Sequence, residues 1–279
     1  MEERNNRKVT KKFKFLNFVL FPAEIQKPAE YVKVLSKIHG DKIKVKTFSD
    51  RQTFITSLEQ VGNCYCGVLS NAVFVDPESK SINKETYEIS ESNVNPDEGL
   101  GLKQWEFWFY PKYHRLAFYA QSSQSQIFKF FNTAFLEVLG SEENYAIYIE
   151  KDRQAIDRIM NSKCIKKLVV DISYSNNANY DDWMAAMDSD FHNGDIRKAH
   201  FEFWGTVSRP LNIIKTKFMK ASLGLSKSNG AAKAILLRED GKTEYVDTDD
   251  HPKVTPVTYT NNLEDQLEKE ISDISNDKD

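Results

Sequence analysis

The stretch QWEFWFYPKYHRLAFYAQ, residues 104–121, predicts an antiparallel hairpin, because large apolar side chains alternate on both sides of the turn signal YPKY. Trp105, Phe107 and Phe109 fall on one face of the first strand, with the period of two that a buried sheet face requires. We therefore expect this face of the hairpin to belong to the hydrophobic core.

The other face of the hairpin is mixed in character. With Tyr110 and Tyr113 flanking the turn, Trp108 is expected opposite Arg115. A tryptophan beside a guanidinium on an open face suits stacking on bases or a cation–π contact. The stacking signature of RNA-recognition motifs is absent, and the same face would serve equally well for packing against a helix.

Strand and helix patterns alternate along the rest of the chain. Strand patterns cover 13–21, 42–48, 65–75, 145–149, 166–174, 198–207 and a hairpin at 231–246 that turns at Asp-Gly. Helical patterns cover 28–40, 122–140, 151–160 and the surroundings of Trp183, and a capping-box pattern at Ser49 and Gln52 predicts one more short helix. The expected fold class is α+β, with mixed or antiparallel sheets and helices packed on one face.

The similar order of elements in the two halves leaves open a pair of α+β units. The expected divisions are an N-terminal unit at 1–140 with a basic arm and a mobile loop at 76–101, a C-terminal unit at 141–247, and an acidic flexible tail at 248–279. The segment from Glu239 to the end contains thirteen acidic residues and only four lysines. Within the tail, LEDQLEKEISDI is also compatible with a helix formed on a partner.

Composition excludes several classes of protein. The chain has 279 residues, 40% of them apolar, which suffices for a sizeable core. The run FKFLNFVLF, residues 13–21, is much shorter than the ~20 residues that span a bilayer and lacks a signal-peptide cleavage site, so a cytoplasmic protein without membrane contact is expected. The three cysteines are expected to be reduced, and the C-x-C spacing is not that of a zinc knuckle.

The net charge of −3 conceals a segregation of charge along the chain. Between Phe203 and Leu237 there is no acidic residue, while the basic residues are Arg209, Lys215, Lys217, Lys220, Lys227 and Lys233. The strand pattern KIKVKTF adds Lys42, Lys44 and Lys46 on one face. These blocks predict contacts with the phosphate backbone of RNA or DNA, although lysines on a solvated face would give the same pattern.

Catalysis has fewer candidate residues. Asp171 lies within an apolar strand, and His200 and Glu202 alternate along another, so adjacent strands would join an acid, a base and a second carboxylate as in a metal-dependent phosphodiesterase. Alternatively, these side chains face solvent or pair with lysines. The segment DSDFHNGD fails the calcium-loop pattern, and the chain lacks a P-loop, H-E-x-x-H and G-x-S-x-G, so no cofactor or metal site is predicted beyond a divalent ion in the case of a nuclease.

The segments WFYPKYHRLAFYAQ, AIYIEKDRQAIDRIM and LVVDISYSNNANYDDW, with the amphipathic helix between the first two, carry a resemblance at the level of pattern. Over about residues 100–185 the chain resembles uncharacterised bacterial and phage proteins of the kind encoded in phage-defence islands and mobile elements. The resemblance carries no transferable site residues. It implies an intracellular protein acting in antiviral defence, toxicity or its control.

Two functions of different classes follow from these observations. The first is a nucleic-acid-binding component of a defence or toxin-type system, acting on RNA or single-stranded DNA. If this component is an enzyme, the expected activity is that of a nuclease. The second is a protein-interaction subunit that binds a partner protein through exposed aromatic side chains and the acidic tail. Steep salt dependence of binding would favour the first function.

Overall fold

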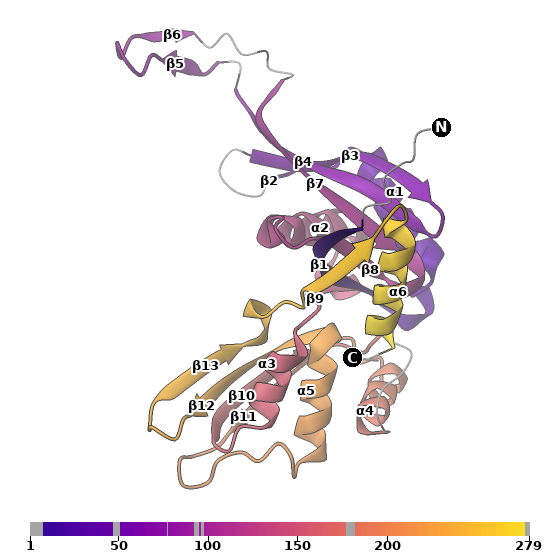
Figure 1. Cartoon of the computed structure of the whole chain (residues 1–279), viewed down its shortest axis with the longest axis vertical. Helices are drawn as coiled ribbons and strands as arrows, with labels where there is room; N and C mark the ends of the chain where they lie inside the picture. Colours follow the sequence, from indigo (N-terminus) through magenta and orange to yellow (C-terminus); the bar gives the residue numbers. More distant parts are fainter. Residues whose placement is uncertain are drawn as a thin grey trace.

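A computed structural model describes residues 8–46, 51–76, 78–91, 95, 98–176 and 182–276 and shows an α+β fold, which confirms the predicted class (Figure 1). The strands are β1 (Val9–Leu20), β2 (Val45–Lys46), β3 (Arg51–Val61), β4 (Cys64–Phe74), β5 (Lys80–Ile82), β6 (Ile89–Glu91), β7 (Gly99–Tyr110), β8 (Arg115–Tyr119), β9 (Tyr145–Ile149), β10 (Ile165–Ile172), β11 (Ala199–Trp204), β12 (Gly230–Leu237), β13 (Thr243–Asp247) and β14 (Thr255–Tyr259). The α-helices are α1 (Pro28–Gly40), α2 (Gln124–Leu139), α3 (Arg153–Met160), α4 (Asp182–Asn193), α5 (Lys217–Asn229) and α6 (Leu263–Ser275). None of the helices in this described part of the chain is long and apolar enough to cross a membrane.

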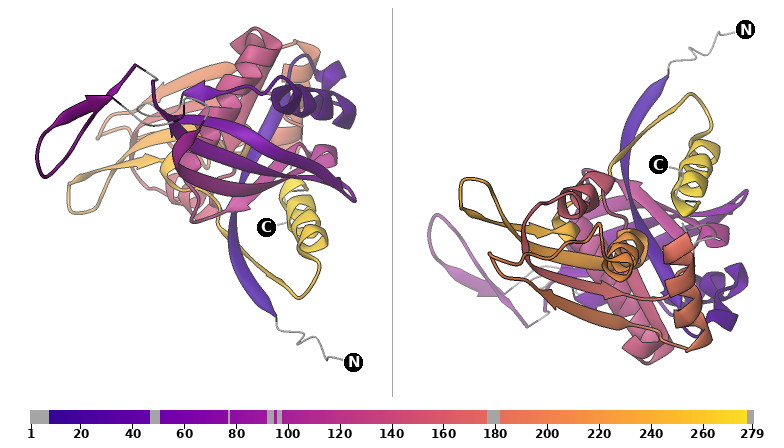
Figure 2. Two further views of the ribbon diagram at one scale, coloured as in Figure 1. Left: turned by 90° about the horizontal axis from the view of Figure 1, so that it is seen from above. Right: turned by 90° about the horizontal axis from the view of Figure 1, so that it is seen from below.

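The first sheet is antiparallel and curled, with strand order β14-β1-β8-β7-β4-β3-β2 and with β9 also paired to β1 (Figure 2). From Phe13 onward, both faces of β1 are buried apart from the half-buried Lys14. Leu16, Phe18 and Leu20 pack in the core under α1 and α2, whereas Phe13 and Phe15 pack in a second cluster under α6. Because successive side chains point to opposite faces, the apolar residues of this one strand contribute to the cores on both sides of the sheet.

The predicted hairpin is present as β7 and β8, but its register differs from the expectation. Tyr110 pairs with Arg115, and Phe109 pairs with Leu116, because the turn contains four residues and ends at His114 in a left-handed conformation with φ of 56°. The shift moves each partner by two residues, so the division into faces is preserved. Both faces are nevertheless buried, since α6 covers the face that was expected to be open.

The second sheet is antiparallel, with strand order β11-β10-β12-β13, and it includes the predicted Asp-Gly hairpin as β12 and β13. Apolar residues of α3, α4 and α5 form one cluster with the inner face of this sheet. The outer face carries no helix in the described part of the chain, and its side chains at alternate positions of β11 are exposed. Alternate side chains of the edge strand β11 therefore point to an open face and to a helix-covered face of the sheet.

The expected divisions of the chain need correction. Strands β9 and β14, both beyond residue 140, complete the first sheet, so the sheets do not separate near residue 141. The acidic segment 248–279 is not a flexible tail within the described residues, because it forms β14 and α6, whose Leu267 and Ile271 are fully buried.

Two further segments differ from their sequence patterns. The short helix expected from Gln52 onward is the strand β3, and its proposed cap Ser49 lies outside the described residues. The expected loop at 76–101 includes a small hairpin of β5 and β6 that projects away from both sheets (Figure 1). The basic arm is described only from residue 8 onward.

Candidate nucleic-acid interface

The start of α5 gathers three of the predicted basic residues. Thr216 is the N-cap residue, and its hydroxyl donates to the carbonyl of Asn212 at 2.9 Å, which fixes the turn that precedes the helix. Lys215, Lys217 and Lys220 therefore lie around the amino end of α5, whose first turn contains no acidic residue. The positive end of a helix dipole disfavours cations, so this arrangement lowers the stability of the free protein and suits an anionic ligand.

Exposed apolar side chains adjoin these lysines. Trp183 is 47% exposed, and the Lys217 ammonium lies 3.7 Å from the centroid of its ring. Phe218 is 46% exposed and contacts Phe201 of β11 edge-on, with ring centroids 5.0 Å apart. We call the group of Trp183, Lys215, Lys217, Phe218 and Lys220 the α5 patch. Within the described residues no carboxylate lies at ion-pair distance from its three lysines.

The outer face of β11 presents a second exposed tryptophan. Trp204 is 67% exposed, and the Lys167 ammonium of β10 lies 4.2 Å from the centroid of its ring. Lys167 also forms an ion pair with Glu202, and this hydrogen bond lowers the pKa of the Glu202 carboxyl. A lysine thus lies over an exposed tryptophan at two places, on the outer face of β11 and between α4 and α5.

The predicted catalytic residues are only partly brought together. Asp171 and His200 pair across β10 and β11, and the imidazole Nδ1 lies 2.6 Å from the carboxylate Oδ1 of Asp171. Glu202 shares this face but pairs with Lys167. The expected adjacency therefore holds for an acid and a base, which could act on a proton of a bound substrate, and the catalytic role itself stays a prediction.

A cavity at the junction of the two sheets adjoins this pair. It has a volume of about 420 Å³ and is lined in part by Asp171, Lys151, Tyr148 and Asp249. Burial lowers the pKa of Lys151, although Asp249 lies 3.1 Å from its ammonium, and burial raises the pKa of Tyr148 to about 12. The cavity has the size of a small-molecule site. Among the residues that the structure describes, however, no three His, Cys, Asp or Glu side chains group closely enough to hold a metal ion as they stand.

The predicted stacking face on the hairpin is corrected by the structure. Trp108 is only 6% exposed and packs against Phe13 and Tyr119, under α6. Arg115 is fully buried, with its Nε 2.6 Å from Glu150. Neither side chain can reach a nucleic acid, because the mixed face of the hairpin is a core face.

The remaining basic residues are dispersed. Arg209 is exposed in the loop between β11 and α5, whereas Lys227 is half-buried at the far end of α5. Lys233 is paired with Asp247 at 3.0 Å on the outer face of the second sheet. Lys42, Lys44 and Lys46 lie on the first sheet or next to it, with Lys44 over the ring of Phe74. The basic block of the sequence is therefore not one surface.

Three residues of the candidate interface were not predicted from the sequence. Trp204 shares the alternation of His200 and Glu202, and this parity placed it on the polar face of its strand. Phe218 interrupts the lysines of the basic block, as aromatic residues do in many nucleic-acid interfaces. Trp183 had no such signal, because its neighbour Lys217 comes from another helix.

A comparison with known protein families assigns the chain to a family. The model of a family described as a domain of unknown function, DUF4747, matches residues 9–275. The chain belongs to this family. The DUF4747 match runs from the first residue of β1 to the last residue of α6, so both sheets, the α5 patch and the junction cavity lie within the domain. No curated protein matches the DUF4747 chain.

Proposed function

We propose that this protein binds single-stranded nucleic acid, RNA or DNA, along the edge of β11 and over the α5 patch. The observation that carries the proposal is the placement of Lys215, Lys217 and Lys220 at the positive end of a helix without carboxylate partners among the described residues. A phosphate group would offset the mutual repulsion of these charges.

The aromatic side chains support a single strand over a duplex. The bases of a single strand can stack on Trp183 and Trp204, and each such contact is worth roughly 1–3 kcal/mol. When phosphates draw the ammonium groups of Lys217 and Lys167 off the rings, the ring faces become available to bases. Stacking accepts any base, so little sequence preference is expected.

The setting of this activity is proposed from the resemblance alone. We infer a cytoplasmic component of a bacterial antiviral-defence or toxin-type system, in which nucleic acid is the partner. The alternative, a protein-interaction subunit, rests on exposed aromatic side chains and on the acidic segment as binding elements. The acidic segment supports it less, because α6 packs on the protein's own first sheet.

Fluorescence anisotropy with labelled single-stranded RNA, single-stranded DNA and duplex tests the proposal. The triple variant K215A/K217A/K220A should lose affinity and reduce the slope of log affinity against log salt by about 2 units, as expected for three lost phosphate contacts. The comparison variant K42A/K44A/K46A removes the same charge from the other predicted basic block, beside β2 of the first sheet, and should lose less affinity because that block lies apart from α5 (Figure 1). Equal affinity of the wild-type protein and the first variant would contradict the proposal.

Strand cleavage is a second candidate function, favoured by the 2.6 Å contact between His200 and Asp171 next to the junction cavity. Asp171 would hold one tautomer of the imidazole, which would then accept a proton from the attacking group. The variants H200A and D171N should abolish cleavage while leaving binding intact. Cleavage that survives both changes would exclude this pair.

A further inference from the structure

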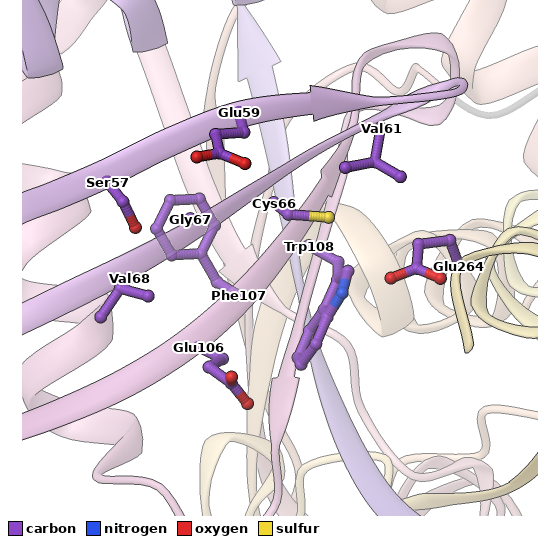
Figure 3. Close-up of a pocket in the computed structure, with 10 residues that line it drawn as sticks. All are labelled: Ser57, Glu59, Val61, Cys66, Gly67, Val68, Glu106, Phe107, Trp108 and Glu264. Carbon is purple, nitrogen blue, oxygen red and sulfur yellow. The ribbon is translucent and has the colours of Figure 1, made fainter. Parts of the chain in front are cut away.

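A pocket on the first sheet is lined by acidic side chains and the thiol of Cys66, and by no basic side chain (Figure 3). Its volume is about 310 Å³, and its walls come from β3, β4, β7 and the first turn of α6. Glu59, Glu106 and Glu264 supply carboxylates. Because none of the residues that line the pocket is Lys, Arg or His, its electrostatic potential favours a cation.

One thiol, that of Cys66, lines this pocket, and a second thiol, that of Cys64, lies beside it in the core. Cys64 and Cys66 share a face of β4, and their sulfur atoms are 3.6 Å apart. The Cys64 thiol is buried and donates to the carbonyl of Val61 at 3.3 Å. Cys66 is half-buried and lines the pocket, with its sulfur on the side of Trp108 and Glu264 (Figure 3). One thiol is therefore held by the core, and the other is open to ions from solvent.

We propose that Cys64 and Cys66 bind a thiophilic d¹⁰ cation of the zinc group, such as Zn²⁺ or Cd²⁺. A zinc ion at the usual distance of about 2.3 Å from both sulfurs would span their 3.6 Å separation with an S–Zn–S angle of about 103°. This angle is near the tetrahedral value that zinc prefers. The two sulfurs thus bind the ion without movement of the backbone.

A disulfide fits the same residues less well. Residues two apart on a strand have Cα atoms about 6.6–6.8 Å apart, which is the upper end of the range for disulfides. Closing the bond would require the sulfur atoms to approach from 3.6 Å to about 2.05 Å. The strand geometry therefore favours a bridging ion over a direct bond.

The remaining coordination positions are open to water and to Glu264. Glu264 lies in the first turn of α6, and its carboxylate faces the pocket (Figure 3). A change in its side-chain torsions would bring an oxygen ligand to the ion and would connect α6 to β4. Binding replaces two S–H bonds by two metal–sulfur bonds and releases two protons to solvent for each ion.

Titration of the reduced full-length protein with Cd²⁺ tests the proposal, with the sulfur-to-cadmium charge-transfer absorption and the protons released as readouts. Wild-type protein should show saturable absorption at one ion per chain and release two protons per ion. Cys66→Ser should lose both signals, and Cys64→Ser should do the same. The matched control Cys164→Ser, which changes the third cysteine, should keep them. Glu264→Gln should weaken binding about tenfold.

Other outcomes would overturn the proposal. Retention of the cadmium signal in Cys66→Ser would place the ion elsewhere, and this half-buried position is the decisive one if Cys64→Ser fails to fold. Absence of the signal in wild-type protein would also exclude the site. If mild peroxide instead joins the two sulfurs in a disulfide and no ion binds, the thiols are a redox pair and not a metal site.

Discussion

Arg115 and Glu150 are both fully buried, and their side chains hold together the parts of the chain that meet beneath β1. The guanidinium also donates to the side chain of Asn17 at 2.5 Å, and the hydroxyl of Ser228 donates to the second carboxylate oxygen at 2.7 Å. Each charge depends on its partner, because burial has removed the water that would otherwise solvate it.

Loss of either charge should therefore be costly. We expect Arg115→Met or Glu150→Gln alone to lower the free energy of unfolding by about 3–5 kcal/mol, since each leaves its partner charged, buried and unpaired. Urea denaturation measures this change. As a control, Lys163→Ala breaks the exposed pair with Glu239 and should alter stability little. A loss of less than about 1 kcal/mol at Arg115 would show that water reaches Glu150.

His114 makes stability depend on pH. Its ring is buried and stacked on Tyr31 at 4.3 Å between centroids, and burial, together with the neighbouring Arg115, lowers its pKa to about 3. In the unfolded chain His114 binds a proton near pH 6.5, whereas in the folded chain it stays neutral at that pH. The contribution of His114 to the free energy of unfolding is therefore fully present above pH 6.5. It is lost as the pH falls from about 6.5 towards 3, by about 1.4 kcal/mol per unit.

The variant His114→Asn tests this dependence, because asparagine tolerates the left-handed backbone at this position and does not titrate. Urea denaturation between pH 7 and pH 4.5 should show a shallower fall in stability than in the wild-type protein. Parallel curves for the two proteins would mean that other groups cause the acid sensitivity.

The amino end of α5 illustrates a conflict between stability and binding within one element. Lys220 lies in the first turn of the helix, where the dipole favours a negative charge. Lys220→Glu should therefore stabilise the free protein by about 0.3–1 kcal/mol and weaken nucleic-acid binding. Thermal unfolding and anisotropy at low salt measure the two effects. Lys269→Ala, an exposed change on α6, should alter neither, whereas tighter binding by Lys220→Glu would contradict the proposed interface.

Elements with a strong local signal were predictable from the sequence. The Asp-Gly turn places Gly241 at a φ of 78°, so the β12–β13 hairpin follows from turn chemistry alone. The sequence of β3 wrongly predicts a helix, because Phe54, Ile55 and Leu58 fit a helical spacing and a register irregularity between Ile55 and Ser57 interrupts the strand alternation. Helix α6 was predictable as a helix, but its docking on the first sheet depends on contacts that no local pattern encodes.

The candidate site was predictable in part for the same reason. Pairing of Asp171 with His200 needs only two adjacent strands, which their apolar patterns suggested. The burial of Trp108 and Arg115 depends on which elements cover the hairpin, and α6 lies well over a hundred residues further along the chain. Long-range packing thus decides which aromatic residues remain available for binding.

The molecule as a whole depends on β1 and on the chain beyond residue 140. Val19 and Phe21, at the end of β1 and just after it, belong to the hydrophobic cluster of the second sheet, and Asn17 donates to Ser228 and Asn229 at the end of α5. A strand shared in this way couples the two sheets, because neither core is complete without it.

We therefore expect both sheets to unfold in one transition. The variants W183F/W204F and W105F/W108F leave tryptophan fluorescence only in the first sheet or only around the second. In each variant the urea midpoint from fluorescence should coincide with the midpoint from far-ultraviolet circular dichroism, as two-state unfolding requires. Comparison within one variant removes the effect of the destabilisation caused by changing buried Trp108. Separate midpoints would show that the sheets fold independently and that the buried contacts of β1 do not couple them.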